Sequence, residues 1–271
     1  MLFQQKKIQT LLGKINVHMT GSGPAMVCWP SLMMSGLMWE GQAKYFGDSY
    51  QMILIDSPGH GESELLDKVF TMEDCAKCLQ EILDALNINE CVLLGNSWGG
   101  MMGGVFAALY PERTRAAVLM NCTASIASEK QKSEYAVSVS LLRDLDEYPD
   151  SLVELSVKAF AGETTENTKP VVVEYIKSIV KRVDPKSVSW AIESVVPMRE
   201  DQHALLQTIQ TPVFVVTGKE DRTFSVDETK AMADSIPNAI FKVLPRVGHL
   251  AALEAPEIVN KEIDSFLKSI T

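Results

Sequence analysis

Short, almost continuous apolar runs recur along the chain and alternate with segments of helical periodicity. Five runs have the length of a strand: 25–29, 51–55, 91–94, 116–120 and 212–217. Strands that are apolar at successive positions are typical of parallel sheets, which are covered on both faces. The alternation predicts an α/β fold with a mostly parallel, doubly wound sheet and right-handed crossover connections.

The first residues follow a different pattern. Apolar and polar positions alternate over 7–12 and again over 14–19, with Gly13 between them. This pattern predicts an antiparallel hairpin that precedes the parallel part of the sheet.

Two helices carry clear start signals. Apolar residues repeat at three and four positions over 72–86, behind Thr71 as a predicted N-cap and with Asp74 three positions later. The last helix is predicted to begin at Pro256, because proline is favoured in the first helical turn. Both helices present one apolar stripe, so each should pack on the sheet.

Between 123 and 210 the strand pattern stops. We expect this segment to form a helical cap inserted into a core made of residues 1–122 and 211–271; the alternative is a set of peripheral helices that extends the core. The predicted helices cover 135–147, 151–161, 171–183 and 187–195.

Composition narrows the classes of function. The chain has 271 residues, with 35 acidic against 25 basic side chains and a formal net charge of −10, which argues against a nucleic-acid partner. No apolar run is long enough for a signal peptide or a membrane span, so we expect a cytoplasmic protein without a membrane partner. The five cysteines are predicted to be reduced and buried. The C-x-x-C at Cys75 and Cys78 has no second pair or nearby histidine to complete a zinc site.

The strongest chemical signal is GNSWGG at 95–100, a G-x-S-x-G between a predicted strand and a predicted helix. A turn that projects a serine at this junction strains the backbone and requires small flanking residues. Ser97 is the predicted nucleophile. The backbone N–H of Trp98, at the start of the helix, is a predicted oxyanion donor.

A serine nucleophile needs a base, and the chain has four histidines. Of these, His249 follows the apolar segment 239–244 and precedes the last helix. It therefore lies at a strand's carboxyl end, where ligands bind in open parallel sheets. The orienting acid is predicted to be Asp221, at a G-x-x-D spacing from Gly218, with Glu220 as its competitor.

These motifs, together with DSPGHGES at 56–63 and VGH near the end, resemble the α/β-hydrolase superfamily over essentially the whole chain. The stretch WPSLMMSGLMWEGQ at 29–42 is similar to that of 3-oxoadipate enol-lactonases. The resemblance implies a second oxyanion donor, the N–H of Leu32. Pro30 and Ser31 stand where most relatives carry His-Gly, which leaves a binding role for Ser31 open.

The resemblance implies a serine hydrolase of a small-molecule carboxylic ester or lactone, acting through Ser97, His249 and Asp221 without metal or cofactor. The same triad serves carbon–carbon bond hydrolases and cofactor-free perhydrolases or haloperoxidases in relatives, and a small-molecule receptor is the alternative of another class.

Two sequence features bear on the substrate. A dicarboxylate would need a cation in the cap, and Arg143, Arg182 and Arg199 are available. Methionines near the oxyanion donors would instead form an apolar wall, unless they only pack the nucleophile helix on the sheet. These methionines are Met33, Met34, Met38, Met101 and Met102. Tyr135 and Trp190 are aromatic candidates for the pocket wall, or for helix packing.

Overall fold

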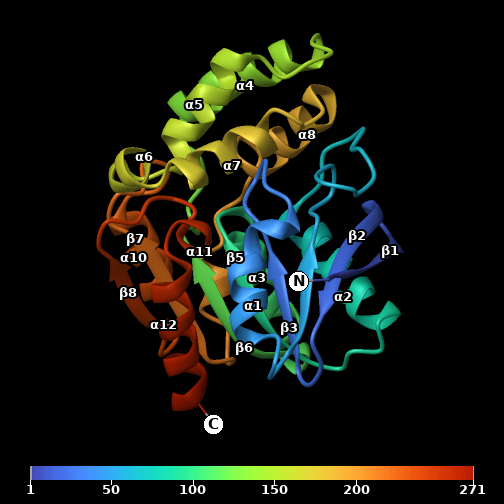
Figure 1. The fold of residues 1–271 in the computed structure, drawn as a ribbon, viewed down its shortest axis with the longest axis vertical. Helices are drawn as coiled ribbons and strands as arrows, with labels where there is room; N and C mark the ends of the chain where they lie inside the picture. Colours follow the sequence, from blue (N-terminus) through green and yellow to red (C-terminus); the bar gives the residue numbers. More distant parts are fainter. Residues whose placement is uncertain (1, 271) are drawn as a thin grey trace.

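The computed structural model describes residues 2–270, and an eight-stranded sheet runs through its centre (Figure 1). The strand order is β1-β2-β4-β3-β5-β6-β7-β8, and every neighbouring pair is parallel except β1 with β2 and β2 with β4. This confirms the predicted α/β fold with a mostly parallel sheet. The strands are β1 (Gln4–Thr10), β2 (Gly13–Thr20), β3 (Ala25–Trp29), β4 (Gln51–Ile55), β5 (Cys91–Asn96), β6 (Thr114–Met120), β7 (Val213–Gly218) and β8 (Ile240–Leu244).

Successive strand residues face opposite layers of helices, which explains the continuous apolar runs. In β3, Val27 and Trp29 pack in the cluster that contains α2, α3 and α10, whereas Met26 and Cys28 pack in the cluster that contains α1 and α12. Both faces are therefore buried. These helices are α1 (Glu40–Phe46), α2 (Met72–Ala85), α3 (Trp98–Leu109), α10 (Val226–Asp234) and α12 (Pro256–Ser269), with short elements at η1 (Gly36–Trp39), η2 (Pro111–Arg113) and α11 (Ala251–Glu254).

The two helix start signals predicted from the sequence, at Thr71 and Pro256, are present in the structure. Thr71 and Asp74 form a reciprocal capping box at the start of α2, with N···O distances of 2.9 and 3.1 Å, and α12 begins at Pro256. The hairpin is antiparallel as predicted, but its turn is displaced. Because Thr10 pairs with Gly13, residues 11–12 form the turn and do not extend the first strand.

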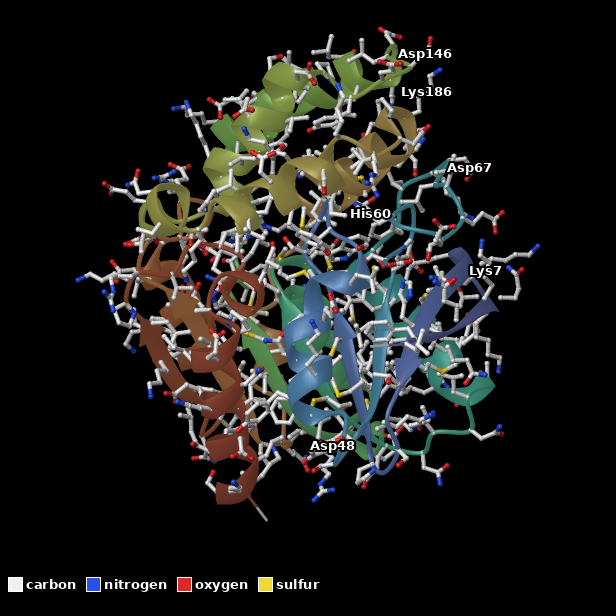
Figure 2. The ribbon with its side chains drawn as sticks, in the orientation of Figure 1. Lys7, Asp48, His60, Asp67, Asp146 and Lys186 are labelled. Atoms are coloured by element: carbon white, nitrogen blue, oxygen red, sulfur yellow. The ribbon has the colours of Figure 1, made fainter. Side chains whose placement is uncertain are left out.

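Residues 123–210, the helical segment, contain no strand, and most of the segment lies above the upper ends of the parallel strands (Figure 1). At its outer end Lys186 Nζ lies 2.9 Å from Asp146 Oδ1 (Figure 2). The predicted range 135–147 was displaced, because a capping box of Ser128 and Gln131 starts the helix earlier. The segment contains α4 (Glu129–Arg143), α5 (Asp150–Phe160), α6 (Glu163–Thr168), α7 (Pro170–Val180), α8 (Pro185–Val195) and α9 (His203–Leu206).

All five cysteines are buried and unpaired. Burial raises the pKa of the Cys78 thiol to about 12 and that of Cys75 well above its usual value, so the C-x-x-C of α2 consists of neutral packing thiols. Within residues 2–270, none of the helices combines the length and the apolar character that crossing a bilayer requires.

Candidate active site

Ser97 lies at a sharp turn between β5 and α3. Its backbone has φ 56° and ψ −112°, outside the regions that L residues favour. A Cβ at Gly95 would lie 2.1 Å from the Gly99 carbonyl oxygen, and one at Gly99 would lie 2.1 Å from that of Trp29. Only glycine therefore lets the strand and the helix approach this closely, and the turn holds the serine hydroxyl at the carboxyl edge of the sheet.

His249 and Asp221 form a buried, hydrogen-bonded pair. His249 Nδ1 lies 3.0 Å from Asp221 Oδ2 and 3.1 Å from Oδ1, where Nδ1–H donates to the carboxylate. Burial alone would raise the pKa of Asp221, but the charge and hydrogen bond of His249, with further donors, outweigh it and lower that pKa. The carboxylate therefore stays ionised beside the imidazole.

The further donors to Asp221 come from its own loop and from Asn121, the residue that follows β6. Oδ1 accepts from the N–H groups of Thr223 (2.8 Å) and Phe224 (3.1 Å), and Oδ2 accepts from Asn121 Nδ2 (2.9 Å). The Asn121 amide also donates to the Gly248 carbonyl at 3.0 Å. Asn121 thus ties the acid loop to the histidine loop.

The His249 loop is held from three directions. Asn96 Nδ2 donates to the His249 carbonyl at 3.0 Å, and the His249 N–H donates to the Phe160 carbonyl at 3.0 Å. The Phe160 ring stacks on the imidazole with centroids 5.7 Å apart. His249 Nε2 is buried and makes no hydrogen bond within residues 2–270, so the contact with Ser97 Oγ is not closed. Such contacts are often long before substrate binds.

Glu254 is a buried carboxylate behind the histidine loop. It accepts from the N–H groups of Gly248 (3.1 Å) and Leu250 (3.0 Å), which flank His249. It also accepts from the N–H of Gly162 in the helical segment at 2.9 Å. One side chain therefore fixes the histidine loop and attaches the helical segment to it.

Ser97 and His249 line one cavity of about 530 Å³ between the sheet and the helical segment. Most of its wall is apolar, which is typical of a small-molecule site. The remaining lining residues are Leu32, Met33, Met101, Glu134, Tyr135, Ser138, Leu142, Tyr148, Leu152, Leu155, Ser156, Ala159, Phe160, Ile192, Val195, Val196, Arg199, Thr223 and Phe224.

Both predicted oxyanion donors are free. Within residues 2–270, neither the N–H of Leu32 nor that of Trp98 has an acceptor, and Leu32 lines the cavity. The loop that carries Leu32 is fixed by His60, which lies where the helical segment meets the core (Figure 2). His60 Nε2 accepts from the Met33 N–H at 2.9 Å, and Nδ1 lies 2.9 Å from the Pro58 carbonyl.

The other candidate residues from the sequence divide into those that line the catalytic cavity and those that do not. Glu220 does not contact His249; its carboxylate accepts from the N–H and hydroxyl of Thr164, both at 2.7 Å. Ser31 is buried but does not line the cavity. Arg143 is paired with Glu193 and lies over the Trp190 ring. Candidates outside the cavity wall are Met34, Met38, Met102, Arg182 and Trp190, whereas Met33, Met101, Tyr135 and Arg199 line it.

The supporting residues Asn121, Asn96 and Glu254 were missed by the sequence analysis. Asn121 follows an apolar strand directly, so it satisfies the same strand-end rule that selected Asp221. Glu254 is a lone carboxylate in the apolar stretch AALEAP, a pattern that favours a buried acceptor of backbone N–H groups. Asn96 carried no comparable signal.

Comparisons with known proteins agree with this geometry. Residues 24–256 match a family model described as the alpha/beta hydrolase fold. The chain is 24% identical to 3-oxoadipate enol-lactonase 2 of Acinetobacter baylyi, over 90% of this chain and 89% of that protein. It is 28% identical to a 2-hydroxy-6-oxononadienedioate/2-hydroxy-6-oxononatrienedioate hydrolase of Paraburkholderia phymatum, over 93% and 86%. Among solved structures, a malate-bound thermophilic esterase from Thermogutta terrifontis superposes with a TM-score of 0.90 at 29% identity, over 98% of this chain and 99% of that one.

Proposed function

The chain belongs to the α/β-hydrolase fold family, and from that premise we propose that it is a serine hydrolase that cleaves a carboxylic ester or lactone. Ser97 is the nucleophile, His249 the base and Asp221 the acid that orients it. The N–H groups of Leu32 and Trp98 form the oxyanion hole. This assignment needs no metal or cofactor.

The reaction follows from these positions. Ser97 Oγ attacks the carbonyl carbon while His249 Nε2 takes its proton, and the two N–H groups stabilise the tetrahedral oxyanion. The imidazolium, stabilised by Asp221, then protonates the leaving oxygen. His249 next removes a proton from water, whose oxygen attacks the acyl-enzyme carbonyl. The second tetrahedral intermediate then expels Ser97 Oγ, which takes the proton back from the imidazolium, and the acid is released.

One observation carries the proposal: Ser97, in a strained turn, shares a cavity with an imidazole whose Nδ1 is bound to a carboxylate and whose Nε2 is free. That arrangement leaves one ring nitrogen available to accept the proton of a serine hydroxyl.

We assign the helical segment the role of a cap over a core formed by 1–122 and 211–271. Support comes from the cavity wall, to which residues of α4, α5 and α8 contribute opposite Ser97 and His249. A cap of this kind excludes water and selects substrates by the shape and charge of its inner face.

The test is proton release at pH 7 to 8 from linear alkyl esters, aryl esters and lactones, with wild type and Ser97→Ala. We expect Ser97→Ala to lower kcat by about four to six orders of magnitude, because the chemical step loses its nucleophile. Ser189→Ala is the matched control, since this buried α8 serine does not line the cavity. It should retain wild-type activity with the same circular dichroism.

The substrate range divides the remaining alternatives. Ser97-dependent release confined to lactones would support a lactonase, and preference for linear or aryl esters would support a carboxylesterase. Absence of Ser97-dependent release from every member would contradict the proposal and favour carbon–carbon cleavage, perhydrolysis or a receptor. Slow turnover with partner binding on ligand addition would identify the receptor.

A further inference from the structure

Arg199 is a buried cation in the wall of the otherwise mainly apolar catalytic cavity. Its side chain belongs to a residue that is only 6% exposed, between α8 and α9. Glu134 also lines the cavity, but it is exposed and lies 3.9 Å from Lys130. Burial removes part of the hydration of a guanidinium, and this costs free energy unless an anion or hydrogen-bond acceptors compensate it.

The protein itself supplies little of that compensation. Arg199 Nε donates to the Ser125 carbonyl at 2.8 Å, which fixes the side chain. Within residues 2–270, no carboxylate lies within 4.0 Å of the guanidinium, and its two terminal nitrogens make no hydrogen bond. Glu228 and Tyr135 act on it only through space, and the Glu228 carboxylate is bound to Ser225 at the start of α10.

The pKa of Arg199 is consistent with a guanidinium that lacks an ion-pair partner among the residues that the structure describes. Burial lowers the pKa of Arg199, and the weaker opposing influences of Glu228 and Tyr135 do not restore it. An arginine with ordinary ion pairing would not show this direction. The side chain remains cationic at neutral pH because its ordinary pKa is so high.

The Phe224 ring lies between the guanidinium of Arg199 and the imidazole of His249. Its central carbon is 5.7 Å from the centroid of the Phe224 ring, and that centroid is 5.6 Å from the centroid of the His249 ring. Because Ser97, Phe224 and Arg199 line the same cavity, a substrate bound to Ser97 would have to extend across Phe224 to contact the guanidinium. Arg199 also lines a second, smaller cavity of about 180 Å³, but it lines the cavity of Ser97 and His249 as well. The other two arginines of the helical segment do not line the catalytic cavity: Arg143 is paired with Glu193, and Arg182 lines a different cavity.

We propose that the terminal nitrogens of Arg199 bind a carboxylate of the substrate, so that the preferred substrate is an ester or lactone with a free carboxylate distant from the scissile carbonyl. This inference rests on the proposed function. A planar guanidinium fixed at Nε matches a carboxylate through two parallel hydrogen bonds, and the apolar wall around it strengthens the pair. The arginine acts as a specificity determinant and takes no part in the bond changes.

Matched ester pairs test the proposal. One pair is the para-nitrophenyl half ester of glutarate and the neutral analogue in which an isopropyl group replaces the carboxylate. The second pair carries the same replacement on the alcohol side of an acetate ester. We expect wild type to prefer the carboxylate member of at least one pair, and Arg199→Met to lower kcat/KM for that member about 100-fold, mainly through KM.

The neutral members and two further variants complete the design. Arg199→Met should lower kcat/KM for a neutral ester far less than for its carboxylate partner, and Arg199→Lys should keep part of the carboxylate preference because the charge remains. Arg143→Met, which removes a cap arginine already paired with Glu193, should leave the preference unchanged.

Each outcome has one meaning. The inference is overturned if wild type shows no carboxylate preference in either pair, a result that does not depend on folding of any variant. It is also overturned if Arg199→Met lowers both members of a pair equally. Ser97-dependent cleavage of the neutral esters in either case would leave the proposed function standing, whereas no Ser97-dependent cleavage of any ester would remove the proposed function itself.

Discussion

Asp221 and Glu220 are adjacent in the sequence but have separate roles in the structure. Asp221 faces His249, whereas Glu220 binds the start of α6 through Thr164. The G-x-x-D spacing pointed to Asp221, and its carboxylate lies 3.0 Å from His249 Nδ1. No spacing rule predicted the donors around it, because Asn121 follows β6 and Asp221 follows β7, and only the sheet order brings the two together.

This difference predicts opposite effects of two conservative substitutions. Asp221→Asn should lower kcat about 10⁴-fold, because the amide cannot stabilise the imidazolium and favours the wrong tautomer. Glu220→Gln should keep kcat within about threefold and lower only the stability of α6. Steady-state kinetics on one good ester measures both, and the opposite ranking would move the acid to Glu220.

His60 makes a pH-dependent contribution to the free energy of unfolding, through its contact with the loop that carries Leu32 and Met33. Burial lowers the pKa of His60, and Nε2 accepts the Met33 N–H only when the ring is neutral there. Because the unfolded chain binds the proton more readily, the free energy of unfolding should fall as pH drops below about 6.5.

A glutamine at this position keeps an acceptor and a donor but does not titrate. His60→Gln should therefore lose less stability than wild type between about pH 7 and about pH 5, measured by urea unfolding at each pH. Equal slopes for wild type and His60→Gln would remove His60 from this account.

At the scale of elements, the predicted strands lie close to the observed ones, and the helices were predicted less evenly. α2 and α12 begin where the sequence places them, whereas α4 begins before the predicted range and α10 was not predicted, although both α4 and α10 start with a capping box. β3 and β4 were predicted to the residue because both ends of each apolar run are sharp. The short helix α6 was not predicted, since it is not long enough to show a helical repeat. α6 begins where Glu220, distant in sequence, binds its first turn.

Glu254 joins the histidine loop to the helical segment, so it should affect both stability and rate. Glu254→Gln replaces one accepting oxygen with an NH₂ group that faces backbone donors, and should lower the free energy of unfolding by about 2 kcal/mol. It should also lower kcat about tenfold, because the backbone around His249 loses its support. Urea unfolding and ester hydrolysis measure the two effects.

The matched control is Glu257→Gln, an exposed acid in the first turn of α12. It should change neither quantity appreciably. A Glu254→Gln protein with wild-type stability and kcat would mean that the three N–H contacts do not position His249.

At the scale of the whole molecule, the fold class was predictable from the alternation of strands and helices. The sequence also predicted that Ser97, Asp221 and His249 lie near one another, because each follows a strand and parallel strands end at one edge of the sheet. The cavity was not predictable. Its wall combines residues of the core with residues of α4, α5 and α8, and only their packing decides that Arg199 faces inward while Arg143 pairs elsewhere.

The net charge of −10 has its own consequence for an anionic substrate. Long-range repulsion slows the approach of a carboxylate ester and is screened by salt, whereas the buried contact with Arg199 is screened much less. Raising NaCl from about 0.01 M to about 0.15 M should therefore increase kcat/KM about twofold for the glutarate half ester and leave its neutral analogue unchanged. A decrease for the half ester would show that local attraction dominates its approach.

The central claim is that Ser97 is activated by His249, and covalent labelling tests it most directly. Diethyl para-nitrophenyl phosphate phosphorylates an activated serine and releases para-nitrophenolate, and the product is stable enough for peptide mass spectrometry. We predict one phosphoryl group per chain, located on Ser97, with labelling about 1000-fold slower in His249→Gln. Labelling at another residue, no labelling, or an unchanged rate in His249→Gln would contradict the account.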